Sequence, residues 1–296
     1  HILFHQIDPG YFPGPDTWGG VGPIPSSGIS QPPVAATFAR LIHEADPAQG
    51  RAWVKQMFPK LAAWHQWFMD WRLDRGAVCI THPWEAGRDN TPDWDGAMAA
   101  LNPEGVRPYT RRDTGHVDPA MRPTKHDYDR YLYLVQIGHD RHWDDAAWKR
   151  DNPFRVADPT MTFTLLRAQR DLAALGRIIG ADTSAIEAAI PVLESGAETL
   201  WNPELACYDV RDVTSGAWSG CVSNASFLAW YAGLDRPALE AQYDRVVSLC
   251  QYPVPSHDPA SDRFEPKRYW RGPTWARRCG WGPSTSRPTW RSCGPG

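Results

Sequence analysis

The segment from Thr81 to Asp95 concentrates side chains that can carry out acid–base chemistry on a sugar. It contains four carboxylates, two tryptophans and an arginine, and Gly87 and Pro92 prevent it from forming a plain helix. Hydrolysis of a glycosidic bond needs one carboxylic acid to protonate the leaving oxygen and a second carboxylate to activate water. Flat aromatic side chains hold the apolar face of a sugar ring. The segment therefore predicts the acid and part of the wall of a carbohydrate site.

The tryptophans of the chain divide into two groups. There are sixteen, far more than packing requires, and many lie beside Pro, Gly, Arg or Asp. Those in loops favour carbohydrate contact, and they include Trp18, Trp84, Trp94, Trp201 and Trp270. Those on helical patterns are typical of a packed core, and they are Trp53, Trp64, Trp67, Trp71 and Trp230.

Charge and cysteine usage exclude several classes of partner. The net charge is −3, without a block of like charge or a basic stripe, so we expect no nucleic-acid and no membrane partner. Six scattered cysteines without a C-x-x-C pair indicate reduced thiols and a cytoplasmic protein. The histidines show no zinc-type spacing, so we expect no metal and no cofactor. The chain starts at His1 without a signal-peptide pattern, and we expect it to begin within a longer protein.

Helical periodicity and capping residues dominate the sequence after a Gly- and Pro-rich stretch at 1–31 that predicts loops. The predicted helices cover 32–44, 48–74 with a break or restart at Pro59, 124–138, 159–180, 183–200, 222–232 and 237–250. Helices 159–180 and 183–200 should form an antiparallel hairpin. Residues 206–217 predict a short β-hairpin at a rim. The pattern indicates an all-α fold in which paired helices form a toroid with long loops.

The motif from His82 to Asp95 resembles the acid-bearing signature of glycoside hydrolase family 63, in its mannosylglycerate and glucosylglycerate hydrolase branch. Four further segments agree with that branch in the same order: 12–18, 28–33, 158–160 and 269–275. An ordered match over residues 1–275 is far more specific than any one of its pieces. The resemblance implies an (α/α)6 barrel, incomplete here, and an enzyme that hydrolyses α-glycosides with inversion. The expected ligand is a small sugar or a glycosylglycerate.

By the same resemblance, Asp89 is the general acid. A general acid must hold its proton near neutral pH, which requires burial against a wall such as Trp84 or a second carboxylate nearby. Arg88 would oppose this unless its side chain points elsewhere. The alternative for Asp89 is a loop or cap carboxylate. Glu85 either supports the catalytic residues from behind without touching the substrate or forms a structural bridge to Arg88, and the sequence leaves both possibilities open.

The resemblance also suggests substrate contacts, and each of them has a structural alternative. A planar guanidinium binds a carboxylate in two-pronged fashion, so the glycerate group could be held by Arg122 with Tyr128, or by Lys125, although a solvated surface arginine is an equal alternative. Asn90 and Asp95 could bond sugar hydroxyls or only their own backbone. The full set of predicted substrate-binding residues is Gln31, Trp84, Arg88, Asn90, Arg122, Tyr128, Tyr269 and Trp270.

Residues 276–296 depart from this pattern. They contain no Leu, Ile, Val, Phe or Met and no acidic residue, so they cannot form an amphipathic helix. We expect a catalytic domain at 1–275 followed by a disordered tail from a reading-frame shift, in which the family's general base is missing and activity is low. Two alternative functions remain: an α-glucosidase or trehalase-like hydrolase of oligosaccharides, and a non-catalytic sugar-binding remnant.

Overall fold

The computed structural model of the chain describes residues 28–111, 114–115, 118–250, 254–266, 268 and 271–272. Most of the predicted N-terminal loops, the tail at 276–296, Trp18, Tyr269 and Trp270 lie outside these residues.

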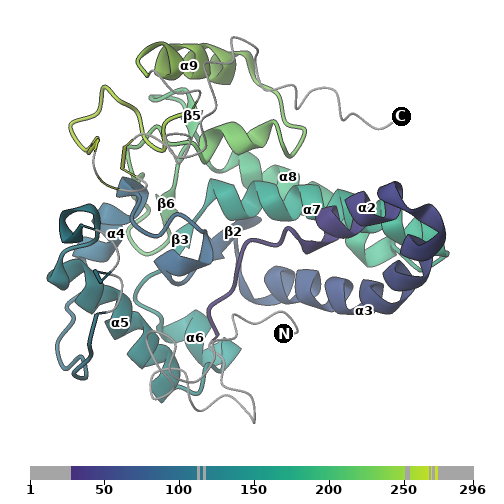
Figure 1. Cartoon of the computed structure of the whole chain (residues 1–296), viewed down its shortest axis with the longest axis horizontal. Helices are drawn as coiled ribbons and strands as arrows, with labels where there is room; N and C mark the ends of the chain where they lie inside the picture. Colours follow the sequence, from purple (N-terminus) through teal and green to yellow (C-terminus); the bar gives the residue numbers. More distant parts are fainter. Residues whose placement is uncertain are drawn as a thin grey trace.

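Four long helices pack together on one side of the molecule (Figure 1). They are α2 (Ala35–Ala45), α3 (Pro47–Trp71), α7 (Pro159–Ile179) and α8 (Ser184–Glu198). Apolar residues of all four meet in one cluster, among them Ala36, Phe58, Leu172 and Ile186. The predicted helices in these regions are therefore confirmed, and α7 and α8 lie side by side as expected.

Local signals explain where these helices begin and end. The Asp158 carboxylate caps α7 by accepting from the Met161 N–H at 3.0 Å, with Pro159 in the first turn. Gly180 ends α7 in the left-handed conformation, with φ at 75°. The predicted break at Pro59 is wrong, because α3 runs through it. Burial of Phe58 and Leu61 on either side outweighs the loss of one backbone hydrogen bond.

A small antiparallel sheet lies next to the helices in the order β1 (Leu73–Asp74), β2 (Ala77–Ile80), β3 (Val156–Ala157) and β6 (Arg211–Asp212). The predicted hairpin at 206–217 is only partly correct. Strand β5 (Cys207–Tyr208) pairs with β4 (Trp201–Asn202), and β6 pairs with β3. The segment therefore connects two sheets, and the described chain is helix-rich with a few short strands.

The remaining helices are α4 (Asp95–Ala99), α5 (Lys125–Asp140), α6 (Asp145–Asp151) and α9 (Pro237–Ser248). Thr124 and Asp127 form a capping box at the start of α5. The predicted helix at 222–232 is wrong, since only a 3-10 turn, η4 (Ser226–Ala229), forms there. The Asn224 N–H instead bonds to the distant Ser256 carbonyl at 3.2 Å, which takes the backbone out of a helix. Among the described residues, no helix has the length and apolar character needed to span a bilayer.

The contact between α8 and the turn before β2 leaves no room for a side chain. A Cβ added to Gly196 would lie 2.0 Å from the backbone carbon and oxygen of Gly76. We expect Gly196→Ala to lower the free energy of unfolding by about 2 kcal/mol or more, because two backbone segments must separate. Gly96→Ala is the matched control, because that helical glycine has nothing within 4 Å of the added Cβ. The control should be neutral or stabilising by up to about 1 kcal/mol, and equal urea midpoints for the two variants would contradict the prediction.

Candidate functional site

The segment with the sugar-site composition folds as two short turns rather than one helix, as predicted. It leaves β2 and forms η1 (Pro83–Glu85) and η2 (Pro92–Trp94), and then it enters α4. Gly87 between the two turns has a φ of 69°, a conformation that favours glycine. We refer to residues 81–95 as the acidic loop.

Glu85 is a structural anchor of the acidic loop. Its Oε1 atom accepts from Arg72 Nη2 at 3.1 Å and from the Ser30 N–H at 2.9 Å. Its Oε2 atom accepts from the Thr81 N–H at 2.6 Å. The bridge from Glu85 to Arg88 that we considered is therefore wrong, because Arg72 is the cation beside Glu85.

Arg88 points away from the neighbouring Asp89 and into the protein. Its guanidinium pairs with Asp158 at 2.8 Å and with Asp93 at 3.3 Å, and it lies 4.9 Å above the ring of Trp94. The Arg88 side chain is buried and is not among the residues that line the pocket of the acidic loop. Its charge is used inside the structure, so a direct substrate contact would require breaking these ion pairs.

Asp93 and Trp94 are also held in the interior. Asp93 accepts from the Ser223 hydroxyl at 2.8 Å and from the Thr91 hydroxyl. Burial opposes ionisation, but Arg88 and these hydrogen bonds outweigh it and lower the pKa of Asp93 below its ordinary value. Trp94 is 1% exposed, so its ring is largely a packing residue and not the open sugar wall that its loop position suggested.

Asp89 differs from the other three carboxylates of the acidic loop. Burial raises the pKa of this half-buried Asp89 from 3.8 to about 6, although the positive charge of Arg122 opposes the rise. No ion pair joins the Asp89 carboxylate to another described residue. Its backbone carbonyl, in contrast, accepts from the Tyr131 hydroxyl at 2.9 Å and from Trp94 Nε1 at 3.2 Å. The main chain of Asp89 is therefore held in place, while its carboxyl forms no ion pair with another described residue.

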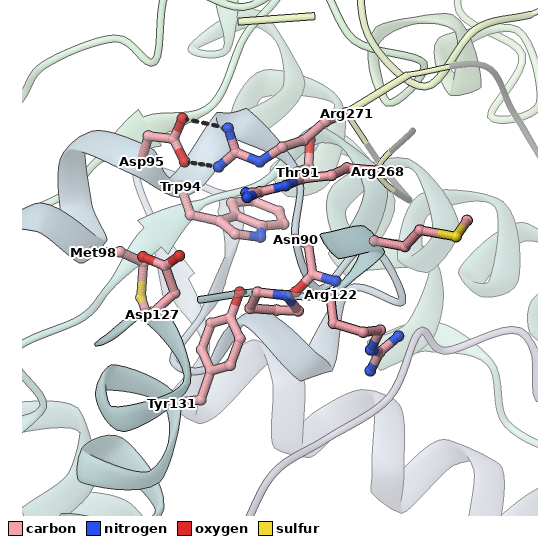
Figure 2. Close-up of a pocket in the computed structure, with 12 residues that line it drawn as sticks. Asn90, Thr91, Trp94, Asp95, Met98, Arg122, Asp127, Tyr131, Arg268 and Arg271 are labelled. Carbon is pink, nitrogen blue, oxygen red and sulfur yellow. Dashed lines mark hydrogen bonds and ion pairs between the residues drawn. The ribbon is translucent and has the colours of Figure 1, made fainter. Parts of the chain in front are cut away.

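A pocket lies between the acidic loop and α5 (Figure 2), and Asp89 is not among its lining residues but directly precedes one of them, Asn90. Asn90 and Asp95 line it from the loop, Asp127 and Tyr131 line it from α5, and Arg122 lines it from the segment before that helix. The pocket combines hydrogen-bonding groups with both signs of charge, which suits a polar ligand that carries a carboxylate.

A cluster of aromatic rings lies beside this pocket. Trp84 is half-buried, with its ring centroid 5.9 Å from that of Tyr131. Tyr128 is buried, because Tyr109 stacks on it at 5.7 Å and the Arg111 guanidinium lies 4.4 Å above its ring. Trp84 thus keeps an accessible surface for a ligand, while the Tyr128 ring is covered.

Gln31 contacts the same region through Trp84. Its Nε2 atom donates to the Trp84 carbonyl at 3.4 Å. Trp84 in turn lies beside Tyr131, whose hydroxyl bonds both the Asp89 carbonyl and Asn90. Gln31, Trp84, Asp89 and Asn90 are thus linked through Tyr131, and Arg122 lines the pocket with Asn90.

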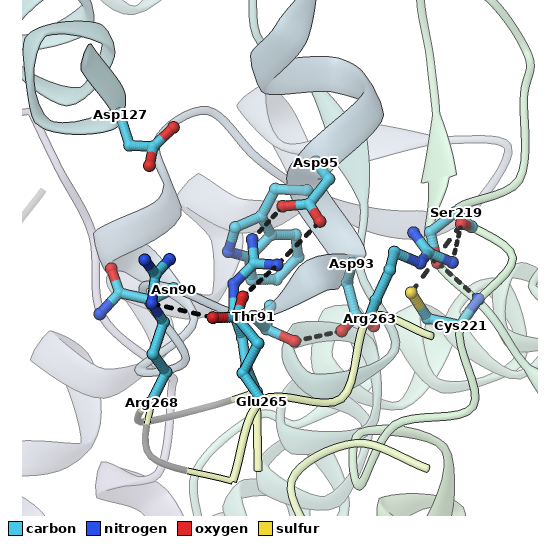
Figure 3. A network of polar contacts seen from close by, with 12 residues as sticks. Asn90, Thr91, Asp93, Asp95, Asp127, Ser219, Cys221, Arg263, Glu265 and Arg268 are labelled. Carbon is cyan, nitrogen blue, oxygen red and sulfur yellow. Dashed lines mark hydrogen bonds and ion pairs between the residues drawn. The ribbon is translucent and has the colours of Figure 1, made fainter. Parts of the chain in front are cut away.

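The end of the described chain closes the pocket from a third side. Arg271 forms a two-pronged ion pair with Asp95, with 3.0 Å between Nη1 and Oδ2. Arg268 also lines the pocket, and Figure 3 shows it beside Asn90. If Asp95 bonds a sugar hydroxyl, it does so while its carboxylate is paired with Arg271.

Four of the charged or tyrosine residues in the pocket were not predicted from the sequence: Asp127, Tyr131, Arg268 and Arg271. Tyr131 could have been found, because it follows the predicted Tyr128 by three residues and shares its helix face. The long-range pairing of Arg271 with Asp95 has no local signal. Within the described part of the chain, no cluster of three or more His, Cys, Asp or Glu residues could hold a metal ion.

Known proteins are similar to this chain in sequence. A family model described as the mannosylglycerate hydrolase MGH1-like glycoside hydrolase domain matches residues 1–278. Mannosylglycerate hydrolase of Thermus thermophilus is 42% identical over 93% of this chain and 69% of its own length. Glucosylglycerate hydrolase of Mycolicibacterium hassiacum is 30% identical over 93% of this chain and 68% of its own length.

A solved structure agrees with these matches. The crystal structure of the family 63 mannosylglycerate hydrolase from Thermus thermophilus with Tris superimposes with a TM-score of 0.87 at 41% identity, covering 94% of this chain and 68% of that one. The chain spans 59% to 69% of the length of the curated relatives that it matches. The chain therefore belongs to the mannosylglycerate hydrolase-like branch of glycoside hydrolase family 63, a family of glycosidases.

Proposed function

We propose that this protein hydrolyses the α-glycosidic bond of mannosylglycerate or glucosylglycerate with inversion, and that Asp89 is its general acid. The relatives named for these two activities support the substrate class. The proposed (α/α)6 architecture and the domain limits of 1–275 rest on the same resemblance. In the reaction, Asp89 gives its proton to the glycerate oxygen as the glycosidic bond breaks, and a second carboxylate takes a proton from the attacking water.

One observation carries the proposal: within the described structure, Asp89 is the carboxylate of the acidic loop that no ion pair uses. Glu85 pairs with Arg72, Asp93 with Arg88, and Asp95 with Arg271. The attraction of an arginine favours the ionised form of a carboxylate and makes it a poorer proton donor, although burial still raises the pKa of Asp95 above its ordinary value. Burial raises the pKa of Asp89 to about 6, so this group can be protonated under mildly acidic conditions.

The remaining contacts follow from the positions around the pocket. We propose that Trp84 faces the sugar ring, that Asn90 bonds a sugar hydroxyl, and that Arg122 holds the glycerate carboxylate. Gln31 supports Trp84. The Arg111 guanidinium covers the Tyr128 ring, so we place Tyr128 behind Arg111 and not in contact with the substrate.

Tyr269 and Trp270 are proposed as part of the sugar wall by resemblance to the family. Both lie outside the described residues, but their neighbours Arg268 and Arg271 line the pocket, which supports the proposal.

We also propose that the 296 residues turn over substrate slowly, because a ready general base is not evident in the described part of the pocket. Asp95 is paired with Arg271. Asp127 accepts from the Thr124 hydroxyl at 2.6 Å in the capping box of α5. The effect of each substitution should therefore be measured relative to the unsubstituted protein.

Removal of the acid should abolish most of the activity without unfolding the protein. We expect Asp89→Asn to lower kcat on mannosylglycerate by about 10²–10⁴-fold, because the amide cannot protonate the leaving oxygen. Asp140→Asn is the control, since Asp140 lies at the surface, where it pairs with Arg107. Steady-state kinetics and calorimetric binding measure the two effects. Full turnover by Asp89→Asn would contradict the assignment, and binding without any turnover by the parent protein would favour a sugar-binding remnant.

The rate should depend on pH through the acid. The active form of Asp89 is protonated, and its pKa is raised to about 6, so kcat/KM should fall as the pH rises through about 6. An ordinary aspartate would give the same fall near about pH 3.9. Initial rates measured from mildly acidic to mildly alkaline pH provide the test. A rate that stays level into the alkaline range would argue against Asp89 as the donor.

Recognition of the carboxylate should depend on Arg122. We expect Arg122→Gln to raise KM for mannosylglycerate about tenfold or more, because a charge-assisted bond is lost. The KM for mannosylglycerol, which has no carboxylate, should change little. Lys125→Gln is the control, since Lys125 is exposed and pairs with Asp129. Equal cleavage of neutral oligosaccharides and mannosylglycerate would instead favour the α-glucosidase or trehalase-like alternative.

A further inference from the structure

The backbone oxygen of Asp89 is held from two sides. The Tyr131 hydroxyl on α5 lies 2.9 Å from it, and Trp94 Nε1 in η2 lies 3.2 Å from it. A carbonyl oxygen has two lone pairs, so both donors can bond at once. Trp94 Nε1 is also 3.2 Å from the Arg88 carbonyl, and the Arg88 guanidinium covers the indole. The Trp94 side of this clamp is therefore anchored in the protein interior.

The Tyr131 side is anchored by a second contact with the acidic loop. The main-chain carbonyl of Tyr131 is 3.0 Å from His82 Nε2. His82 Nδ1 accepts from the Trp84 N–H at 3.1 Å, which leaves the ring proton on Nε2 to donate to Tyr131. Tyr131 of α5 thus contacts the acidic loop twice, at His82 before Trp84 and at Asp89 after it.

The Tyr131 hydroxyl remains a donor at the pH of the reaction. Burial, with a further contribution from the Asp89 charge, raises the pKa of Tyr131 well above its ordinary value. The hydroxyl is also 3.0 Å from Asn90 Oδ1, and Figure 2 shows it directed toward Asn90 at the pocket. Its single proton can serve either oxygen, and both belong to the peptide segment that carries the acid.

We propose that Tyr131 is a positioning residue for the general acid: its hydroxyl holds the Asp89 peptide and so sets the direction of the carboxyl toward the leaving oxygen. This inference rests on the proposed function. Tyr131 does not exchange a proton with the substrate. It acts through Asp89, where a displacement of about 1 Å at a catalytic group is enough to cost up to about a hundredfold in rate.

The test uses two substrates that differ in their need for an acid. Mannosylglycerate requires protonation of its leaving oxygen, whereas α-mannosyl fluoride releases fluoride without a proton from the enzyme. We expect Tyr131→Phe to lower kcat on mannosylglycerate roughly tenfold, with KM changed less than about twofold. The rate on α-mannosyl fluoride should stay within about twofold of the parent rate. The alkaline limb of the pH profile should move to lower pH, because a less constrained Asp89 gains hydration.

Tyr208→Phe is the matched control, because it removes the hydroxyl of another buried tyrosine, which bonds Arg236. Its unfolding midpoint should fall as in Tyr131→Phe, while both rates and the pH profile stay unchanged. Equal losses on the two substrates for Tyr131→Phe would overturn the inference, since they would indicate general damage. Unchanged kinetics for Tyr131→Phe would also overturn it. If the unsubstituted protein cleaves neither substrate, the proposed function fails first.

Discussion

The buried guanidinium of Arg88 is the interaction on which the acidic loop depends. It joins Asp158, the cap of α7, to Asp93 in the loop, and it covers the indole of Trp94. Removal of one partner from a buried ion pair typically costs about 3–5 kcal/mol, because the remaining charge stays in a medium that solvates it poorly. The loop is therefore attached to the first turn of a long, buried helix. This attachment also restricts the backbone of Asp89, the residue next to Arg88.

The same network explains why neighbouring carboxylates differ in their chemistry. Three of the carboxylates in the acidic loop each pair with an arginine: Glu85 with Arg72, Asp93 with Arg88, and Asp95 with Arg271. The ion pairs of Glu85 and Asp95 tie the loop to other segments of the protein, and the Arg88 charge helps to lower the pKa of Asp93. Asp89 is left with partial burial, which favours its neutral form, and with its backbone fixed by Tyr131 and Trp94. The pairing of charges thus separates the three anchoring carboxylates from Asp89, the proposed general acid.

Much of the helical frame could be predicted because its signals are local. The cap at Asp158, the stop at Gly180 and the capping box at Thr124 are each read within a few residues, and all three are present. Prediction failed where distant backbone decides the conformation. Asn224 bonds to the Ser256 carbonyl and does not enter a helix, and Pro59 is tolerated because its neighbours are buried. No short window of sequence contains Ser256 together with Asn224, or the residues of α2 and α7 against which Phe58 and Leu61 are buried.

For the site, the sequence by itself determined the residue types and the order of the motifs, which were enough to indicate a sugar-cleaving chemistry and its family. Only the tertiary structure decided what each member does. It sends Arg88 inward, pairs Glu85 with Arg72, buries Trp94 and brings Tyr131 to the peptide of Asp89. The reason is physical: whether a carboxylate serves as an anchor or as an acid depends on the cation and the amount of water beside it, and these come from segments far away along the chain.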